Sequence, residues 1–512
     1  MAISRVNSVV IQGLDGISII VEVDLGLGLP KFSIVGLPDK AVDEAKERTK
    51  SALKNSNIPF PQHLVTVNLA PADVKKSGTG YDLPIALGIA VGLEQVEQSA
   101  LENAGFIGEL SLSGDIKPVS GILPATMHVR DLGWKSLYVP SANGAEAAII
   151  DGIDIYPVES LRQLILHLRG EKLIKPLPQT EWQGQVDKAV YTDMSSIRGQ
   201  NQAKRSLEIA ASGGHNVLMS GPPGSGKTML AKAFAGILPT MTKNEVFEVT
   251  KIYSVAGLLT ADEPIMLRRP FRSPHHTSST ISLIGGGQWP KPGEISLAHR
   301  GVLFLDEFPE FPRSALESLR QPLEDGTVSI SRANGSVHFP AKFILLATQN
   351  PCPCGYLHDT IKRCRCSQTE IKRYHQRLSG PLLDRIDLHI TVPRVEVDDL
   401  SNAGNGETTE SIRLRVEKAR KIQSVRFEGT KIVSNAEMGV KMIDQFCVLD
   451  VASRNLLNKA VERYGLSARS YHRIIKVART IADLSGEENI QQNHIAESLQ
   501  FRESSQDEEN IR

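Results

Sequence analysis

Eight consecutive residues near the middle of the chain have the types and the spacing of a phosphate-binding loop. They read GPPGSGKT, follow the apolar run HNVLMS and precede the helical run MLAKAFAGIL. A strand before the loop and a helix after it are the context that this motif requires. The run predicts an ATP site that consists of Gly221, Pro222, Pro223, Gly224, Ser225, Gly226, Lys227 and Thr228.

Each residue type in this loop has a physical role. Glycines let the backbone N–H groups surround phosphate oxygens, and the N-terminus of the following helix adds a favourable field. We expect Lys227 to reach the β- and γ-phosphates and the Thr228 hydroxyl to bind Mg²⁺. A glycine-rich turn by itself can be purely structural, but here the lysine and the hydroxyl stand in the required places.

Two carboxylates follow the apolar run GVLFL further along the chain. Asp306 stands where an acid holds Mg²⁺ through water, and Glu307, one residue later, is positioned to polarise the attacking water. In isolation such a pair is often a surface feature of a strand end. Beside a phosphate-binding loop it predicts hydrolysis of ATP rather than phosphoryl transfer to a small molecule.

Four of the five cysteines form two C-x-C pairs separated by nine residues: Cys352, Cys354, Cys364 and Cys366. Four thiolates at close spacing suit tetrahedral Zn²⁺, which would hold an otherwise loose loop in shape. Disulfides and unbound thiols are the alternatives. Cys447 stands apart and is expected in a core.

Composition limits the class of protein. At 512 residues the chain should contain roughly three domains. The formal net charge is +0, so nucleic acid would have to be met by local basic patches. The N-terminus has no signal pattern and no apolar run spans a bilayer, so a soluble protein with no membrane partner is expected. Few cysteines fit a reducing, cytoplasmic location.

The pattern of apolar runs predicts an α/β fold in several parts. Residues 1–170 alternate strands with helices, and 171–194 form a polar linker. Residues 195–400 repeat strand, loop and helix, which suits a parallel sheet flanked by helices. Residues 401–505 are mostly helical, and 506–512 are a tail.

Several motifs resemble those of the AAA+ ATPases. The stretch that ends in Gly199 and Gln200 resembles the adenine-side box, and Asn350 resembles the sensor that orients the lytic water. Arg385 resembles the arginine finger that is presented to a neighbouring subunit, although a salt bridge with an adjacent aspartate is the alternative. Arg469 resembles the second sensor in the lid, with Arg473 nearly as good a candidate. This resemblance implies an ATP- and Mg²⁺-dependent, head-to-tail ring, a homo-hexamer.

Two further segments narrow the resemblance. The segments FRSPHHT, LIGGG and PKPGEISLAHRGVLFLDE resemble those of the magnesium-chelatase-like ComM/YifB family. Residues 326–339 alternate between apolar and polar side chains, as in a β-hairpin with its turn at Asn334-Gly335. In ringed relatives such inserts line the pore. The resemblance implies DNA contacts by Arg268, Arg269, Arg272, Lys291 and Arg332. His275 and His276 suit phosphate binding and turn capping equally.

The N-terminal region is similar to the proteolytic domain of Lon proteases. In that family a Ser–Lys dyad carries the chemistry, but here Asp82 replaces the serine and no lysine stands at the second position. Ser77 and Lys75 share one loop, which is usually only a polar turn. We therefore expect a non-proteolytic domain, in which Lys75, Lys76 and Arg130 are weak candidates for DNA contacts.

The resemblance implies a ring-forming, ATP-dependent DNA translocase or helicase that promotes branch migration of recombination intermediates during natural transformation. The alternative is a magnesium-chelatase-type ATPase that remodels a protein partner. A Lon-like, ATP-dependent protease is a distant third.

Overall fold

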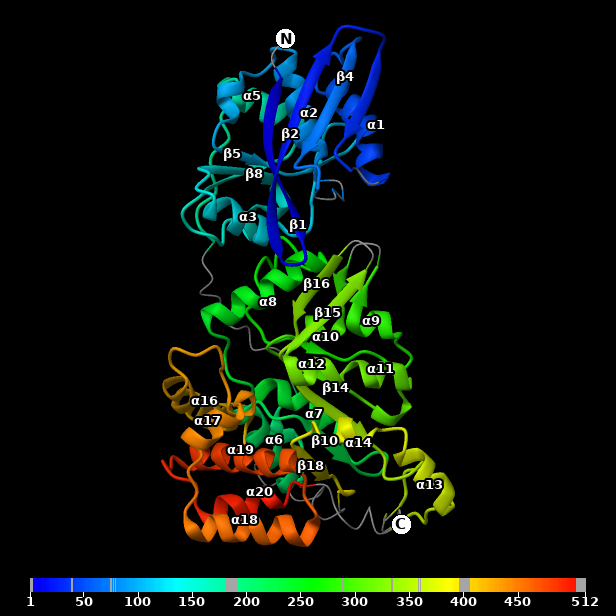
Figure 1. Ribbon diagram of the computed structural model, residues 1–512, viewed down its shortest axis with the longest axis vertical. Helices are drawn as coiled ribbons and strands as arrows, with labels where there is room; N and C mark the ends of the chain where they lie inside the picture. Colours follow the sequence, from blue (N-terminus) through cyan, green and yellow to red (C-terminus); the bar gives the residue numbers. More distant parts are fainter. Residues whose placement is uncertain are drawn as a thin grey trace.

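In the computed structural model, an N-terminal α/β body lies at one end of the long axis (Figure 1). Below it in this view lies a central α/β body, and a helical C-terminal body packs along the lower flank of the central body. The structure describes residues 3–37, 40–73, 76, 78, 80–180, 192–287, 290–332, 335–357, 359, 361–395 and 406–502.

The N-terminal body is built on a seven-stranded sheet in the order β3-β4-β2-β1-β5-β8-β9. Strands β1 and β2 pair antiparallel from Ser4 opposite Val23 to Gln12 opposite Asp15 and form a hairpin. The main elements are β1 (Ser4–Gln12), β2 (Asp15–Gly26), β3 (Lys31–Val35), α1 (Lys40–Asn55), β4 (Leu64–Ala70), α2 (Asp82–Gly92), β5 (Ala104–Phe106), β6 (Glu109–Leu110), β7 (Ile116–Lys117), α3 (Ile122–Asp131), β8 (Ser136–Pro140), α4 (Gly144–Ala147), β9 (Asp154–Val158) and α5 (Leu161–Leu168).

The central body contains a five-stranded sheet in the order β11-β14-β17-β10-β18, and every pairing in it is parallel. Its strands are buried on both faces, as their continuous apolar sequence predicts. The elements that frame it are α6 (Asn201–Gly213), β10 (Val217–Ser220), α7 (Lys227–Ile237), α8 (Lys243–Ala256), β11 (Phe271–Arg272), β14 (Val302–Leu305), α11 (Arg313–Ser318), α12 (Arg320–Asp325), β17 (Ile344–Gln349), α13 (Gln368–His375), α14 (Gly380–Leu383) and β18 (Leu388–Thr391).

Two segments are inserted between the elements of this sheet. The first, between β11 and β14, contains α9 (Thr280–Ile284), β12 (Gly285–Gly286), β13 (Lys291–Pro292) and α10 (Glu294–Leu297). The second is a hairpin of β15 (Thr327–Arg332) and β16 (Gly335–Pro340), as the alternating sequence predicts. Asn334 lies outside the described residues.

The C-terminal body is a bundle of α16 (Thr409–Arg426), α17 (Val440–Phe446), α18 (Val451–Tyr464), α19 (Ala468–Ser485) and α20 (Gln492–Leu499). The predicted α/β fold, a parallel sheet flanked by helices with a mostly helical C-terminal part, is confirmed. Across the described residues, no helix combines the length and apolar character needed to cross a membrane.

The N-terminal body docks on α8 and on the second insert (Figure 1). Ser254, on α8, donates a 2.5 Å hydrogen bond to Glu146, whose carboxylate also accepts the backbone N–H of Leu123 at 2.9 Å. Leu14, at the turn between β1 and β2, packs against hydrophobic clusters of the central body. The tip of the β1–β2 hairpin also approaches Val337 of β16. The N-terminal body therefore contacts the inserts for which the family resemblance implies DNA contacts.

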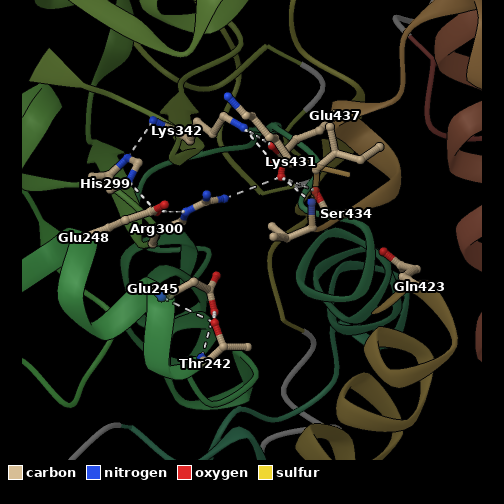
Figure 2. Close-up of polar contacts among 12 residues, drawn as sticks. Thr242, Glu245, Glu248, His299, Arg300, Lys342, Gln423, Lys431, Ser434 and Glu437 are labelled. Carbon is tan, nitrogen blue, oxygen red and sulfur yellow. Dashed lines mark hydrogen bonds and ion pairs between the residues drawn. The ribbon is translucent and has the colours of Figure 1, made fainter. Parts of the chain in front are cut away.

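The helical body is attached to the central body by ion pairs (Figure 2). Glu437 accepts a 2.5 Å hydrogen bond from Lys342 and lies 3.7 Å from the Arg300 guanidinium. Arg300 in turn donates to Glu248 of α8 at 2.8 Å, and His299 lies 3.1 Å from the same carboxylate. Burial by itself would raise the pKa of Glu248, but these two donors outweigh it and hold that pKa at about 2.

We predict that Glu437→Ala loosens the joint between core and helical body. Arg300 and Lys342 would lose a carboxylate, which typically costs about 1–3 kcal/mol when charged groups are partly buried. Hydrogen exchange of residues 432–439 and the thermal unfolding midpoint measure the effect. Glu428→Ala, at an exposed position of the same body, is the matched control. Equal stability of both variants would contradict the assignment.

Candidate nucleotide and metal sites

The phosphate-binding loop lies at the carboxyl edge of the parallel sheet. Gly221 directly follows β10, Asn350 directly follows β17, and Asp306 directly follows β14. These three strands are neighbours in the order β14-β17-β10, and parallel strands end at the same edge. The sheet therefore gathers the loop, the sensor candidate and the two carboxylates that the sequence predicts.

Lys227 occupies the centre of this group. Its ammonium donates to the carbonyl oxygens of Gly221 at 2.7 Å and Pro222 at 2.9 Å, and to Asn350 Oδ1 at 3.4 Å. Burial lowers the pKa of Lys227 to about 8, against the opposing attraction of Asp306 and Glu307. The Ser225 hydroxyl in the same loop is buried with no hydrogen-bond partner among the described residues. The loop is thus built to receive anionic oxygen.

The predicted Mg²⁺ ligands are in contact with one another. The Thr228 hydroxyl donates to Asp306 Oδ2 at 3.0 Å, and the Thr348 hydroxyl donates to Asp306 Oδ1. Thr348 also accepts the backbone N–H of Glu307 at 3.1 Å. No motif in the sequence marks Thr348, although it lies on β17, two residues before Asn350. Its hydrogen bonds hold Asp306 Oδ1 and the Glu307 backbone in position.

Glu307 lies beside His276, whose role the sequence did not decide. Its backbone adopts the left-handed region at φ 53°, and its Oε2 lies 3.3 Å from Nδ1 of His276. The His275 ring lies against the His276 ring, tilted by 34° with 4.1 Å between centroids, and His275 caps its own turn through Thr277. Of the two predicted roles, His275 thus shows turn capping. His276 links the start of the first insert to the predicted base.

The adenine-side residues lie beside the loop. Gln200, at φ 56°, donates to the carbonyl oxygen of Pro393 at 2.6 Å and of Ser225 at 3.5 Å. Gly199 precedes it, also with a positive φ. A Cβ at Gly221 would lie 2.1 Å from the carbonyl oxygen of Val392. The segment after β18 therefore closes this side of the site.

Arg385 and Arg469 share one carboxylate partner, which is not part of the phosphate-binding loop. Both guanidinium groups bind Glu324, at the end of α12, and the Arg469 contact is 2.9 Å. They line a cavity of about 560 Å³ between the central and helical bodies, and its described lining includes no residue of 221–228. Arg473 is tied to the Ile386 carbonyl and lies 3.7 Å from Asp384. Since Arg469 is 47% exposed and Arg473 17%, Arg469 reaches further outward.

The four cysteines of the two C-x-C motifs form one cluster, which begins two residues after Asn350 at the carboxyl edge of the sheet. Their sulfur atoms all lie within 4.8 Å of one another. Three of the separations are 3.4, 3.7 and 3.6 Å. Tetrahedral Zn²⁺ with Zn–S bonds of about 2.3 Å places its sulfurs about 3.8 Å apart, so the cluster fits such an ion.

Comparisons with known proteins agree with this arrangement. Three family models match: "Magnesium chelatase, subunit ChlI" over residues 193–400, "Subunit ChlI of Mg-chelatase" over 21–143, and "Magnesium chelatase, subunit ChlI C-terminal" over 406–502. The chain is 44% identical to the competence protein ComM of Haemophilus influenzae over 506 residues, 98% of each chain. It is 39% identical to the uncharacterized protein YifB of Escherichia coli over 503 residues, 98% of this chain and 97% of that one.

The chain belongs to the ComM/YifB family of magnesium-chelatase-like AAA+ proteins. A more distant match, 21% identical over 408 residues, is the DNA replication licensing factor Mcm6 of Drosophila melanogaster; it covers 73% of this chain and 44% of that protein. Membership of the AAA+ family implies ATP and Mg²⁺ as cofactors. The unpartnered Ser225 hydroxyl and the Thr228–Asp306 contact fit both.

The residues predicted to contact DNA in this ComM/YifB-family chain differ in their hydrogen-bond partners and in their exposure to solvent. All five N–H groups of Arg269 bond to Glu245 and to backbone carbonyls, so this arginine braces the core. Arg272 forms a two-point ion pair with Glu294 at 2.7 and 2.8 Å. Lys291 is exposed on β13, and Arg268 is half-buried. The side chain of Arg332 lies outside the described residues.

Position 82 of the N-terminal body has a structural partner. Asp82 is fully buried, and Arg48 donates to both of its oxygens at 2.6 and 3.1 Å. The backbone N–H of Leu110 donates to it as well. A carboxylate held in this way is no nucleophile toward a peptide bond. Lys76 is buried, and Ser77 and Lys75 lie outside the described residues.

We predict that ATP binding takes up a proton above pH 8. Lys227, with its pKa lowered to about 8, is largely neutral there and regains its proton when phosphate oxygens approach. ATP affinity should therefore fall as the pH rises through 8. Calorimetry in two buffers of different ionisation enthalpy measures the uptake.

Lys227→Arg, which stays charged, should bind ATP without this uptake, whereas Lys232→Ala, at an exposed position of α7, should retain it. Identical proton uptake by wild type and Lys227→Arg would show that another group titrates.

Proposed function

We propose that this protein is an ATP-driven DNA translocase that works as a head-to-tail homo-hexameric ring and promotes branch migration of recombination intermediates. The observation that carries the ring is that Arg385 and Arg469 line a cavity whose described lining includes no residue of the phosphate loop. The competence protein ComM, similar over its full length, supports a role in natural transformation.

The ring follows from charge. As the γ-phosphoryl group leaves, negative charge spreads over its oxygens and needs cations beyond Lys227. Arg385 and Arg469 are held together by Glu324 on another face of the chain. A head-to-tail contact brings that face to the phosphate loop of the next subunit, so that both arginines act there. Arg469 then completes the neighbour's site and not its own.

Within one site the chain's own groups have distinct tasks. Lys227 and the loop N–H groups hold the phosphates, and Thr228 and Asp306 would hold Mg²⁺, which neutralises phosphate charge. Glu307 accepts a proton from the attacking water, which Asn350 orients. His276 ties Glu307 to the first insert, so that a change at the insert alters the position of the base.

DNA as the substrate is supported by the inserts and by the relatives. Lys291 is exposed on the first insert. Arg268 lies just before β11, after which that insert begins, and Arg332 belongs to the β15–β16 hairpin. Contacts of such residues with phosphates would weaken strongly with salt. We leave Arg269 and Arg272 out of this surface because carboxylates already pair with them.

We also propose that Cys352, Cys354, Cys364 and Cys366 hold one structural Zn²⁺. Their mutual distances support this assignment.

A motor that remodels a protein partner is the second candidate. The match of all three magnesium-chelatase models favours it. The two functions differ in what stimulates hydrolysis.

The first test is steady-state ATP hydrolysis with and without single-stranded and forked DNA at fixed moderate salt. We expect DNA to stimulate hydrolysis, and Glu307→Gln to lower the rate at least about a hundredfold while ATP still binds. An ATP hydrolysis rate that neither DNA changes would contradict the translocase proposal and favour the protein-remodelling motor.

Mixing two inactive variants tests the shared site. Lys227→Ala removes the phosphate lysine, and Arg385→Ala removes the neighbour's arginine. In mixed rings about a quarter of the sites would combine an intact loop with an intact arginine, so activity should partly return. No recovery, with ring formation confirmed by light scattering, would place Arg385 outside the neighbouring site.

A further inference from the structure

We propose that the four-cysteine loop is a wall of the ATP site, so that zinc occupancy of the cluster controls nucleotide binding. The inference rests on the ATP site and the zinc assignment proposed above. It adds a direct link between them.

The first contact joins the cysteine loop to the phosphate loop. Gly355, between Cys354 and Cys364, has φ 83°, and its backbone lies against the ring of Pro223. A Cβ at Gly355 would lie 2.5 Å from Pro223 Cδ and 3.7 Å from Asn350 Cγ. Only glycine fits this approach without displacing the phosphate loop or the sensor.

The second contact joins the cysteine loop to the adenine side. Arg394 donates to Asp359, within the cysteine loop, at 3.0 Å. The preceding residue, Pro393, accepts the hydrogen bond from Gln200. The cysteine loop thus touches both sides of the nucleotide site, at Pro223 and next to Pro393.

The third contact fixes the root of the loop. His375 on α13 bonds to the carbonyl oxygen of Pro351, which stands between Asn350 and Cys352. Cys352 itself is fully buried. Any shift of Cys352 is therefore transmitted to Asn350, two residues away.

Scattered hydrogen bonds and the four sulfurs, rather than regular secondary structure, hold the loop in this shape. Among the described residues from 351 to 366 there is no helix or strand, so no regular ladder of backbone hydrogen bonds supports it. Metal coordination in such a segment contributes folding free energy directly. Loss of zinc would free Gly355 from Pro223 and release both the phosphate loop and Asn350.

The test compares zinc content with nucleotide affinity in the full-length protein. Zinc is measured by mass spectrometry, and binding of a fluorescent ATP analogue is titrated in excess Mg²⁺. Three samples are compared: as purified, treated with a zinc-selective chelator, and reloaded with zinc. We expect one zinc per chain, affinity lowered roughly tenfold to a hundredfold on removal, and recovery on reloading.

Two variants separate the metal from the contact. Cys364→Ser/Cys366→Ser should lose both zinc and affinity, whereas Gly355→Ala should keep zinc and still bind ATP more weakly. Cys447→Ser, which alters the buried cysteine of the helical body, should keep both. If the double variant fails to fold, Gly355→Ala and the chelation series still decide.

The outcomes distinguish the layers of the proposal. A folded, zinc-free protein that binds ATP as tightly as the loaded one would overturn the coupling alone. A wild type that binds no zinc would overturn both the coupling and the zinc assignment. A zinc-loaded protein without ATP binding would overturn the proposed function itself.

Discussion

The parallel pairing of β14, β17 and β10 is the constraint on which the site depends. Ser220 lies opposite Gln349, so β10 and β17 end level, and β14 ends two residues earlier, with Leu305 opposite Ala347. This register delivers the phosphate loop, Asn350 and Asp306 to one edge. Burial of apolar side chains on both sheet faces fixes the register, because a slip would also break the packing of helices on either side.

Charge separation is the second consequence of this architecture. One part of the chain holds Lys227 with Asp306 and Glu307, and another holds the exposed Arg469 and the largely buried Arg385 on Glu324. Glu324 offsets part of the positive charge of the two arginines, and the hydrogen bond from Arg385 lowers the pKa of Glu324. In the proposed ring, these two parts of neighbouring subunits would meet.

The joints between the bodies connect the motor to its inserts. Ser254 and Glu146 attach the N-terminal body to α8, and Lys342 and Glu437 attach the helical body to the strand edge. His276 connects the first insert to Glu307. In the proposed motor, these contacts would carry a shift at the ATP site to the surfaces proposed to hold DNA, since packed elements move as units.

The sequence by itself determined the fold class, the phosphate loop, the acidic pair and the cysteine set. These depend on local spacing and on the period of apolar residues, which are properties of short segments. Only the tertiary structure decided which partner each distant side chain meets. It removed Arg269 from the surface by occupying all of its donors, added Thr348 to the metal site, and set Gly355 against Pro223. Such contacts depend on strand order and on the path of the inserts, which bring together residues far apart in the chain, and local pattern carries no information about either.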